Sequence, residues 1–383
     1  MARSLLRVRG GSDTARVTNA ELLFDLVYVF AVTQLSHYLI SEPTVAGAVR
    51  ALILLGLVWE AWAYTMWTTN WLDPDRAPVR AMLFAIALGS MVLSLAIPQA
   101  FIGRGWAVAG AYAAMQIGRS VFTVFALPDN LSLRRNYERI LCWCLVSGAL
   151  VLAGAAVDGR ARELLWAAAV VVDVLGGITG FYTPGLGRSS TTDWTVDGGH
   201  VAERCHAFVL IALGESIVVL GATLSDLKHI HVTEISVFVF GFLGVIALWW
   251  IYFARAAERA AEVIATASDP GRIARAYHEL HPVMVGGIIV IAAADELVLR
   301  SPWHATTATT WTVIGGSLLF IGGHAAFTAY LWRVRPWSRI AAVLALIALF
   351  PLAAHIAPIA LAGCALAVTV GVCISDAVAG RAA

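Results

Sequence analysis

A glutamate and an aspartate lie one helical turn apart in an otherwise apolar stretch near the start of the chain. Glu21 and Asp25 are the only acids in the segment ELLFDLVYVFAVTQLSHYLI. Residues four apart on an α-helix share a face. An ionisable group at membrane depth costs about 2.5–3.5 kcal/mol on insertion scales and is a functional-site candidate by default. The pattern therefore predicts that these two carboxylates handle a proton, a cation or a polar substrate.

Other ionisable side chains occur inside apolar runs farther along the chain. One cation, Arg119, lies at comparable depth. The acids are Glu60, Asp173, Glu215, Asp295 and Glu296. One explanation is structural: the acids pair with Arg119 or Arg204, or are protonated, and hold helices together. The other explanation is that several acids face a shared polar cavity, because the buried acids outnumber the buried cation.

Four histidines lie close to acids at the starts of two further runs. They occur in His200-Val-Ala-Glu-Arg-Cys-His206 and in His278-Glu-Leu-His281. Neither passage has the His-Glu-x-x-His spacing of a zinc site. We therefore predict no metal site and no cofactor, and we expect the histidines to cap helices, anchor at the interface or hydrogen-bond to the acids of the first run.

The candidate substrate-binding or ion-binding residues are polar side chains within or beside these runs. They are Glu21, Asp25, Gln34, Glu60, Trp62, Arg119, Asp173, His200, Glu203, Arg204, Glu215, His281, Asp295 and Glu296. Gln34 lies farther along the run of Glu21. Trp62 lies near Glu60, where it either lines a cavity or packs against another helix. No residue is assigned a catalytic role.

The composition that must position these residues is that of a membrane protein. Of the 383 residues, 60% are hydrophobic and 13% are charged, and the mean hydropathy is +0.78. A soluble domain has about 25% charged residues. The net charge of +1 gives no strong field that would attract nucleic acid. We expect the lipid bilayer as a partner and a small molecule or ion as substrate, with no nucleic acid and the oligomeric state left open.

Twelve apolar runs have the length of a membrane-spanning helix. They fall at about 19–40, 46–68, 79–98, 105–127, 136–157, 163–182, 203–224, 234–255, 282–300, 308–331, 339–356 and 359–377. Helices are the expected form, because the backbone in lipid must satisfy its own hydrogen bonds. The first run follows several arginines, as in a signal peptide, but it is too long and too acidic for one. The predicted fold class is all-α, a polytopic transmembrane helix bundle of about 12 spans.

The placement of the basic residues predicts the orientation of the bundle. With the amino terminus in the cytoplasm, nineteen of the 26 lysine and arginine residues fall in inside segments, six in outside segments, and Arg119 within a span. An excess of basic residues on the cytoplasmic side is the rule for membrane proteins. Both termini are therefore predicted to be cytoplasmic (N-in, C-in). A missed span would exchange inside and outside for every later loop and remove the excess of basic residues on one side.

Two stretches of sequence resemble each other about half the chain apart. Leu55-Gly-Leu-Val-Trp-Glu-Ala-Trp-Ala-Tyr64 aligns with Leu243-Gly-Val-Ile-Ala-Leu-Trp-Trp-Ile-Tyr252 at Leu, Gly, the second Trp and Tyr. Glu21 opens the first run as Glu203 opens the seventh. The pattern indicates a parallel 6+6 internal repeat, with chance similarity as the alternative. The predicted organisation is a cytoplasmic segment (1–18), a first six-helix half (19–182), a cytoplasmic linker (183–202) and a second half (203–383).

Three passages of the sequence combine into a family signature. They are Glu21-Leu-Leu-Phe-Asp-Leu-Val-Tyr-Val-Phe30 with Thr33 and Gln34, Asn70-Trp-Leu-Asp-Pro-Asp75, and His200-x-x-Glu-Arg204 running into Leu213-Gly-Glu-Ser216. Together they resemble the bacterial low-temperature-requirement A family of integral membrane proteins. The resemblance implies a multi-pass protein of the bacterial cytoplasmic (inner) membrane, but it supplies neither a reaction nor a substrate. Cys205-His206-Ala207 departs from the pattern typical of the family.

The leading functional hypothesis is a secondary transporter or permease. It rests on the twelve runs, the repeat and the buried acids, and the chain has no Walker A motif for ATP hydrolysis. In this hypothesis Asp25, Glu60 and Glu215 carry protons or a cation, with Arg119 as counter-charge. One alternative is an intramembrane enzyme that uses the same groups as general acid and base on a lipid-soluble substrate. Another is a structural or regulatory envelope protein, so enzymatic activity is left open.

Overall fold

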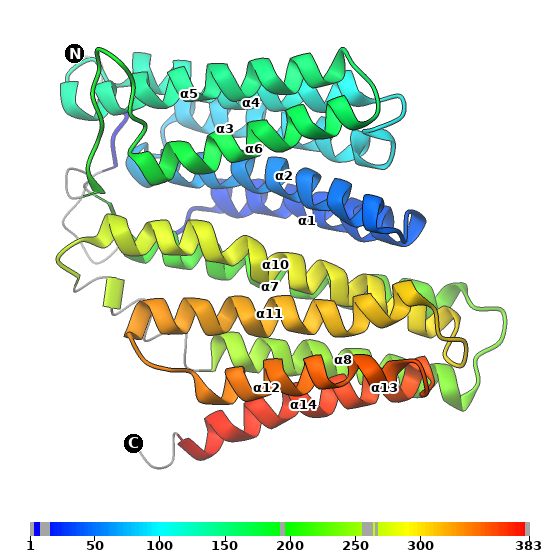
Figure 1. Cartoon of the computed structure of the whole chain (residues 1–383). Coiled ribbons are helices and arrows are strands. Elements are labelled where there is room, and N and C mark those ends of the chain that lie inside the picture. Colours follow the sequence, from blue (N-terminus) through cyan, green and yellow to red (C-terminus); the bar gives the residue numbers. More distant parts are fainter. Residues whose placement is uncertain (1–3, 8–15, 192–195, 255–262, 265–266, 380–383) are drawn as a thin grey trace. The chain divides into compact units, whose positions relative to one another are not determined.

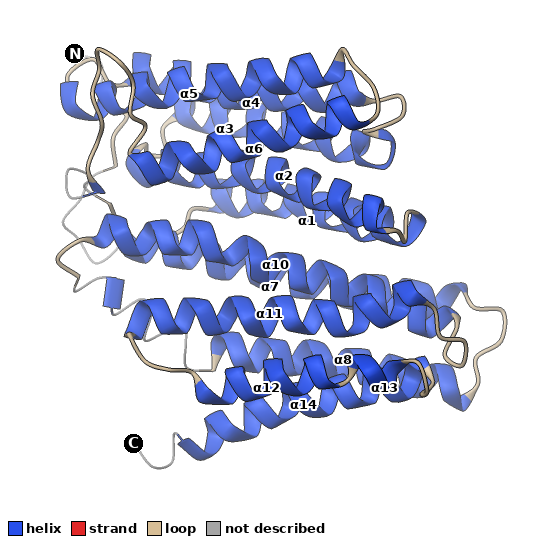
Figure 2. Cartoon of the chain, in the orientation of Figure 1, coloured by secondary structure: helices blue, strands red, loops and turns tan. Residues whose placement is uncertain are grey.

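The described part of the chain is a set of α-helices joined by loops (Figure 1). The computed structural model describes residues 4–7, 16–191, 196–254, 263–264 and 267–379. Its named helices are α1 (Asn19–Ser41), α2 (Val45–Trp71), α3 (Ala77–Ala96), the 3-10 helix η1 (Ile97–Gln99), α4 (Gly105–Ala126), α5 (Leu131–Ala155), α6 (Arg160–Thr179), α7 (Gly198–Asp226), α8 (Val232–Phe253), α10 (Pro270–Arg300), α11 (Thr307–Trp332), α12 (Trp337–Ala348), α13 (Phe350–Ala353) and α14 (Pro358–Ala379). Figure 2 shows helices and loops and no strand in these ranges, so the predicted all-α class is confirmed.

Among the helices of the described residues, nine are long and apolar enough to cross a membrane. They are α1, α2, α3 with η1, α5, α7, α8, α10, α11 and α14. Each coincides with a predicted run, and α4 and α6 coincide with the runs predicted at 105–127 and 163–182. A multi-pass membrane protein is therefore confirmed. Some arginines that entered the predicted orientation lie outside the described residues, namely Arg3, Arg9, Arg255, Arg259 and Arg381.

Two predicted runs differ from the helices by more than a shift of a few residues at one end, and both helical regions contain a proline. α10 begins at Pro270, well before the predicted start, and continues through Pro282. Proline suits the first turn of a helix, where its missing N–H has no helical partner. The run predicted at 339–356 is instead two helices, α12 and α13, because Pro351 lacks the N–H that would bond to Ile347.

The chain divides into two compact units. Unit 1 comprises Met1–Leu35, Val49–Ala207 and Ile264–Glu279, and unit 2 comprises Ser36–Ala48, Phe208–Val263 and Leu280–Ala383. In unit 1, α3 packs on α4, α4 on α5, and α5 on α6. In unit 2, α8 packs against α14, and α11 packs against α12 and α14. The predicted halves and their repeat stay predictions.

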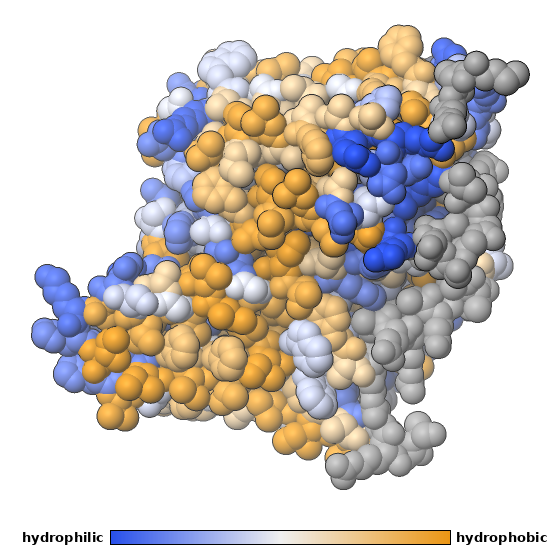
Figure 3. Space-filling model, turned by 180° about the vertical axis from the view of Figure 1, so that it is seen from behind, coloured by the Kyte–Doolittle hydropathy of each residue, from blue (hydrophilic) through white to orange (hydrophobic). Residues whose placement is uncertain are grey.

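Large apolar side chains are exposed along the outer faces of the helices. Leu26 on α1, Leu88 on α3 and Val218 on α7 are each more than half exposed. Figure 3 shows broad hydrophobic areas on the face that it presents. Such surfaces are unusual in a soluble protein. They suit contact with lipid tails, because the helical backbone is already satisfied by its own hydrogen bonds.

The second half of α2 is buried within unit 1. From Trp59 to Asn70 every side chain is buried, except that Trp67 is partly exposed. A helix that is buried on all faces is normally apolar all round, but this segment carries a carboxylate, three threonines and an asparagine. Buried polar groups need hydrogen-bond partners. The three threonine hydroxyls donate to carbonyls of α2 itself, so the carboxylate and the asparagine are the groups that need partners from other elements of unit 1.

Candidate functional site

Arg204 on α7 is the centre of a buried charge cluster in unit 1. Its Nε and Nη2 atoms donate to the two carboxylate oxygens of Asp25 at 2.9 and 2.6 Å. Its Nη1 atom donates to Glu21 Oε1 at 3.0 Å and to Thr69 Oγ1 at 3.2 Å. A bidentate arginine–carboxylate pair is stronger and more specific than a single bond. Every nitrogen of this fully buried guanidinium therefore has an acceptor.

Glu21 belongs both to this cluster and to the start of α1. The backbone N–H and the hydroxyl of Thr18 lie 2.9 and 3.0 Å from Oε2 of Glu21, and the Glu21 N–H lies 3.3 Å from the Thr18 hydroxyl oxygen. This reciprocal arrangement is a capping box. Arg7, in the segment before the helix, donates to the same Oε2 at 2.7 Å. The motif that starts the helix therefore also fixes the carboxylate.

His200 completes what we call the Arg204 cluster, which consists of Arg7, Glu21, Asp25, His200 and Arg204. The amide of Asn70 accepts from the Asp197 N–H at 3.0 Å and donates to the Asp197 carbonyl at 2.8 Å. These two bonds fix the orientation of the amide, so its nitrogen donates to His200 Nδ1 at 3.2 Å. We therefore assign the ring proton to Nε2, which donates to Glu21 Oε1 at 2.7 Å.

Trp62 connects the Arg204 cluster to α2. Its indole N–H donates to Oδ1 of Asp25 at 2.7 Å. The guanidinium carbon of Arg204 lies 5.6 Å from the ring centroid of Phe24 and 5.8 Å from that of Trp62. Aromatic faces attract cations, and more strongly where water is excluded. The ion pair is thus enclosed by two aromatic rings.

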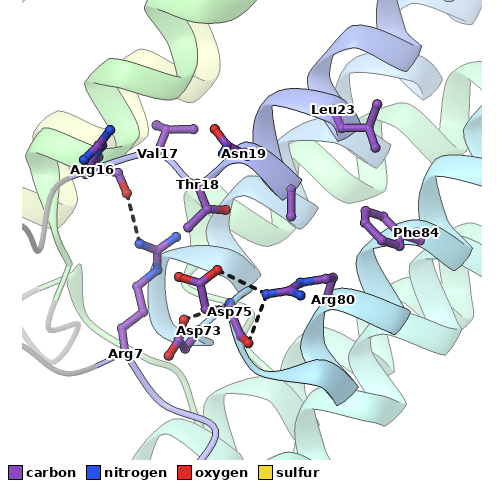
Figure 4. A pocket seen from close by; sticks show the side chains of 11 residues that line it. Arg7, Arg16, Val17, Thr18, Asn19, Leu23, Asp73, Asp75, Arg80 and Phe84 are labelled. Atoms are coloured by element: carbon purple, nitrogen blue, oxygen red, sulfur yellow. Dashed lines mark hydrogen bonds and ion pairs between the residues drawn. The ribbon is translucent and has the colours of Figure 1, made fainter.

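A cavity of about 810 Å³ adjoins the Arg204 cluster (Figure 4). Its charged lining residues are Arg7, Arg16, Asp73, Asp75 and Arg80. Arg80 pairs with Asp75 at 3.2 Å, as Figure 4 shows. Thr18 also lines the cavity. Since Arg7 and Thr18 both bond to Glu21, they connect this cavity to the cluster.

Glu60 and His278 form a second ionisable pair in unit 1. Nε2 of His278, on α10, lies 3.0 Å from Oε2 of Glu60, on α2. The indole N–H of Trp67 donates to Nδ1 of the same ring at 3.1 Å. An indole nitrogen is only a donor, so Nδ1 accepts and Nε2 carries the proton. The neutral ring therefore donates to Glu60.

Pro282 explains an unusual acceptor beside this pair. Proline has no N–H, so the helical bond from residue 282 to the carbonyl of His278 is missing in α10. The indole N–H of Trp59 donates to that carbonyl at 2.9 Å. A side chain of α2 thus bonds to a backbone group that the proline leaves without its helical donor.

Arg119 on α4 is buried without an acid beside it. Its side chain is 1% exposed, its Nη1 lies 3.4 Å from the Thr65 hydroxyl, and its guanidinium carbon lies 5.2 Å from the ring centroid of Tyr64. Within the described ranges, Nε and Nη2 of Arg119 have no hydrogen-bond partner. Leaving a buried charge unpaired is strongly destabilising. Arg119 is therefore the group in unit 1 whose burial most needs an explanation.

Asp173 on α6 is also incompletely bonded. Tyr112 donates to its Oδ2 atom, and Gln116 donates to the Tyr112 hydroxyl at 3.1 Å. Among the residues that the structure describes, Oδ1 of Asp173 and Oε1 of Gln116 have no partner. The hydroxyl of Tyr64 donates to the backbone carbonyl of Asp173 at 3.0 Å. Tyr64 therefore contacts both Asp173 and the guanidinium of Arg119.

Four other predicted residues lie in unit 2. Glu215 is buried on α7, and Nε2 of His281 lies 2.6 Å from a tyrosine hydroxyl of α8. Glu296 accepts from the arginine four residues later at 2.9 Å. Asp295 lines a cavity of its own unit. In the described part of the chain, no three His, Cys, Asp or Glu side chains are grouped as a metal site requires.

Two predicted residues do not join these groups. Gln34 is partly exposed farther along α1. Glu203 is exposed, and its Oε2 accepts from the backbone N–H of Val17 at 3.2 Å. Glu203 therefore holds the segment before α1 and lies outside the Arg204 cluster.

Several residues that complete the groups were not among the candidates. They are Arg7, Thr18, Trp59, Tyr64, Asn70, Tyr112, Gln116 and His278. Three had a readable signal. Thr18-x-x-Glu21 before an apolar run predicts a capping box, Asn70 lies in a passage of the family signature, and His278 is one of the histidines that lie close to acids in the sequence. Tyr112 gave no local signal, since its partner Asp173 is 61 positions away.

Comparison with known proteins decides the family. Residues 16–374 match the family described as "Bacterial low temperature requirement A protein (LtrA)". The chain belongs to the LtrA family. It is also 34% identical over 357 residues to the uncharacterized protein RA0937 of Rhizobium meliloti (strain 1021). The aligned region covers 91% of this chain and 86% of that protein. No solved structure matches the chain.

The passages that suggested the LtrA family from the sequence meet in one place. Glu21 and Asp25 come from the first passage, Asn70 from the second, and His200 and Arg204 from the third. All five are fully buried and joined by the hydrogen bonds of the Arg204 cluster and its Asn70 support. In this LtrA protein one part of each of the three passages therefore belongs to a single buried network.

Proposed function

We propose that this LtrA-family protein is a secondary transporter or permease, and that the polar core of unit 1 handles its solute and its protons. The observation that carries the proposal is the guanidinium of Arg119, which is buried with two nitrogens that have no partner among the described residues. An arginine that only holds helices together would be paired, as Arg204 is. Unpaired donors favour a solute that brings the acceptors.

The chemistry of Arg119 favours a solute with anionic oxygen atoms. A guanidinium binds carboxylate and phosphate oxygens through parallel N–H groups. The ring of Tyr64 supports the charge when no solute is bound, through its contact with the guanidinium. Access to this depth would require helices to part and close around the site, as in alternating-access transporters.

The pair of Glu60 and His278 is the proposed proton carrier. Relays of acids and histidines are the usual proton path in membrane pumps and transporters. A proton taken up by Glu60 would weaken the bond from His278 Nε2 at 3.0 Å. Glu60 precedes Tyr64 by one helical turn, so both act on the same face of α2. Protonation is thereby linked to the surroundings of Arg119.

The other two proposed carriers differ in their surroundings. Asp25 is in a bidentate pair with Arg204, which favours a holding role over repeated protonation. Glu215, buried on α7 in unit 2, remains a proposed carrier of the coupling ion. Its substitution by glutamine is expected to abolish coupling.

The finer topology belongs to the same proposal. It comprises twelve spans with both termini in the cytoplasm, a parallel six-helix repeat and a location in the bacterial inner membrane. The overlap of the helices with the predicted runs supports the number of spans, and the likeness of residues 55–64 to residues 243–252 supports the repeat. The excess of arginine in the inside segments supports the orientation. Labelling of single cysteines placed in alternate loops tests it.

Everted membrane vesicles provide the test of transport. A respiratory pH gradient is followed with a quenching dye while inorganic phosphate, carboxylates and amino acids are added in turn. One anionic class should dissipate the gradient only when the protein is present. Arg119→Gln and Glu60→Gln should lose this response. Glu138→Gln, an acid on α5 paired at a partly exposed position, should keep it.

Two outcomes decide against the proposal. A wild-type response from Arg119→Gln and Glu60→Gln, at equal protein level, would exclude the mechanism. No response to any anionic class, together with an unchanged growth phenotype after neutral substitution of Glu60 and Glu215, would favour a structural role.

A further inference from the structure

Asp295 and Glu296 are neighbours on α10 in unit 2, and their carboxylates differ in their hydrogen-bond partners. Glu296 accepts from Arg300 at 2.9 Å. Oδ2 of Asp295 is buried, and no hydrogen-bond partner for it exists among the described residues. Burial of an ionised carboxylate without a partner is strongly unfavourable. A carboxylate in this position is stabilised either by a proton or by a bound cation.

Asp295 lines a cavity of about 50 Å³ whose other oxygen-bearing side chains are hydroxyls. Ser317 on α11 and Thr369 on α14 line the same cavity and are buried. Their hydroxyls donate to the carbonyls of residues four positions earlier, at 3.3 and 2.9 Å. The hydroxyl hydrogens are thus engaged within the helices, which leaves oxygen lone pairs as acceptors. The side chains offer acceptors and no free donor.

Gly241 on α8 leaves room for the carboxylate. A Cβ atom added there would lie 3.1 Å from Oδ2 of Asp295 and 2.9 Å from a methyl carbon of Leu220. Any larger residue would crowd the carboxylate oxygen. Gly371 on α14 does not line this cavity, and a Cβ added there would meet no atom within 4 Å. The two glycines therefore provide a matched pair of positions.

We propose that this cavity, formed by Asp295, Ser317 and Thr369, is a binding site for a monovalent cation of sodium size. One carboxylate neutralises one positive charge, and hydroxyl and carboxylate oxygens are the ligands that hard cations prefer. A space of this size exceeds the roughly 10–15 Å³ that one water molecule needs. The site lies wholly in unit 2 and does not depend on the solute proposed for unit 1.

Thermal unfolding of the full-length protein in detergent micelles tests the proposal. Sodium chloride is titrated against choline chloride at constant ionic strength. The melting temperature should rise saturably with sodium, on the order of a few degrees. Asp295→Asn should lose the rise, and Thr369→Val should shift it to higher sodium concentration. Glu296→Gln should retain it.

The glycine pair and direct binding complete the design. Gly241→Ala should weaken sodium binding, whereas Gly371→Ala should leave it near the wild-type level. Binding of radioactive sodium to the purified protein measures both variants, and the valine and alanine variants keep the proposal testable if Asp295→Asn does not fold. An absent sodium effect in the wild type, or an equal effect in Asp295→Asn, overturns the proposal. Either result leaves the anion-response test of unit 1 unaffected.

Discussion

Arg204 and Arg119 are both buried arginines of unit 1, but their partners differ. Arg204 has acceptors for all three nitrogens, from Asp25, Glu21 and Thr69. Arg119 has a long contact to the Thr65 hydroxyl, an interaction with the Cys144 thiol and the Tyr64 ring beside it, but no carboxylate within ion-pair distance among the described residues. Two charges of the same type and burial therefore meet opposite conditions within one unit.

The contrast distinguishes an arginine that holds helices together from one that can take part in function. A satisfied buried ion pair is hard to break and hard to change, because removal of one partner leaves a charge in a dry interior. An unsatisfied charge gains most from a ligand or a rearrangement. Burial alone does not distinguish these roles, whereas the list of hydrogen-bond partners does.

Replacement of Arg204 is expected to have the largest effect on stability. Arg204→Met leaves Asp25 and Glu21 without their main partner, so the free energy of unfolding should fall by about 3–5 kcal/mol. Unfolding of the purified protein in micelles measures it. Arg134→Met removes an arginine that is 40% exposed and should have little effect. Addition of Asp25→Asn to Arg204→Met should recover part of the loss, and a purely additive double variant would contradict the pairing.

Removal of the group that orients His200 should have a smaller effect. Asn70→Ala leaves the Asp197 N–H and carbonyl and His200 Nδ1 without their bonds, so the unfolding free energy should fall by about 1–3 kcal/mol. Nitrogen NMR of the histidine ring should then lose the pure Nε2–H form. Gln99→Ala, an exposed amide, is the control. An unchanged ring spectrum would show that Asn70 does not set the tautomer.

The bond between Trp59 and α10 should contribute about 1 kcal/mol. Trp59→Phe removes the donor to the carbonyl of His278, which Pro282 has left without its helical N–H. In a Pro282→Ala background a backbone N–H replaces the lost donor, so the same substitution should cost less. The two unfolding free energies form a double-mutant cycle. An equal loss of unfolding free energy in both backgrounds would show that the indole of Trp59 does not replace the N–H that Pro282 lacks.

Replacement of Arg119 should cost the least stability. Arg119→Met removes a buried charge that has no carboxylate within ion-pair distance among the described residues, so the unfolding free energy should not fall, and relief of the unpaired charge should raise it. The anion response in vesicles should nevertheless be lost. A large loss of stability would instead indicate that Arg119 holds helices together as Arg204 does, and would remove the contrast between them.

The helices were predictable from the sequence because each apolar run is a local pattern. Pro282 shows the limit of that pattern: a proline inside a helix reads as a boundary, but α10 continues through it and a distant indole uses the freed carbonyl. The acids were also recognisable, because charges inside apolar runs are rare. Their partners were not, because pairing joins distant positions.

The choice between Arg119 and Arg204 illustrates that second limit. From the sequence, either arginine could be the partner of the buried acids. Only the packing of α1 against α7 in unit 1 brings Arg204 to Asp25, and only the arrangement of α4 leaves Arg119 beside Tyr64. The family signature marked the paired group, and no motif marked the unpaired one.

The separation of Asp25 and Arg204 in the chain has a consequence for biosynthesis. They are 179 positions apart, whereas Arg7 is only 14 positions from Glu21. At roughly 5–20 residues per second, roughly 10–35 s pass between synthesis of the two partners. Pulse-labelling should therefore show poorer insertion of Arg7→Ala than of Arg16→Ala, and equal insertion would argue against this order of events. Before α7 is synthesised, Glu21 already has a partner in Arg7, a residue made before the helix itself.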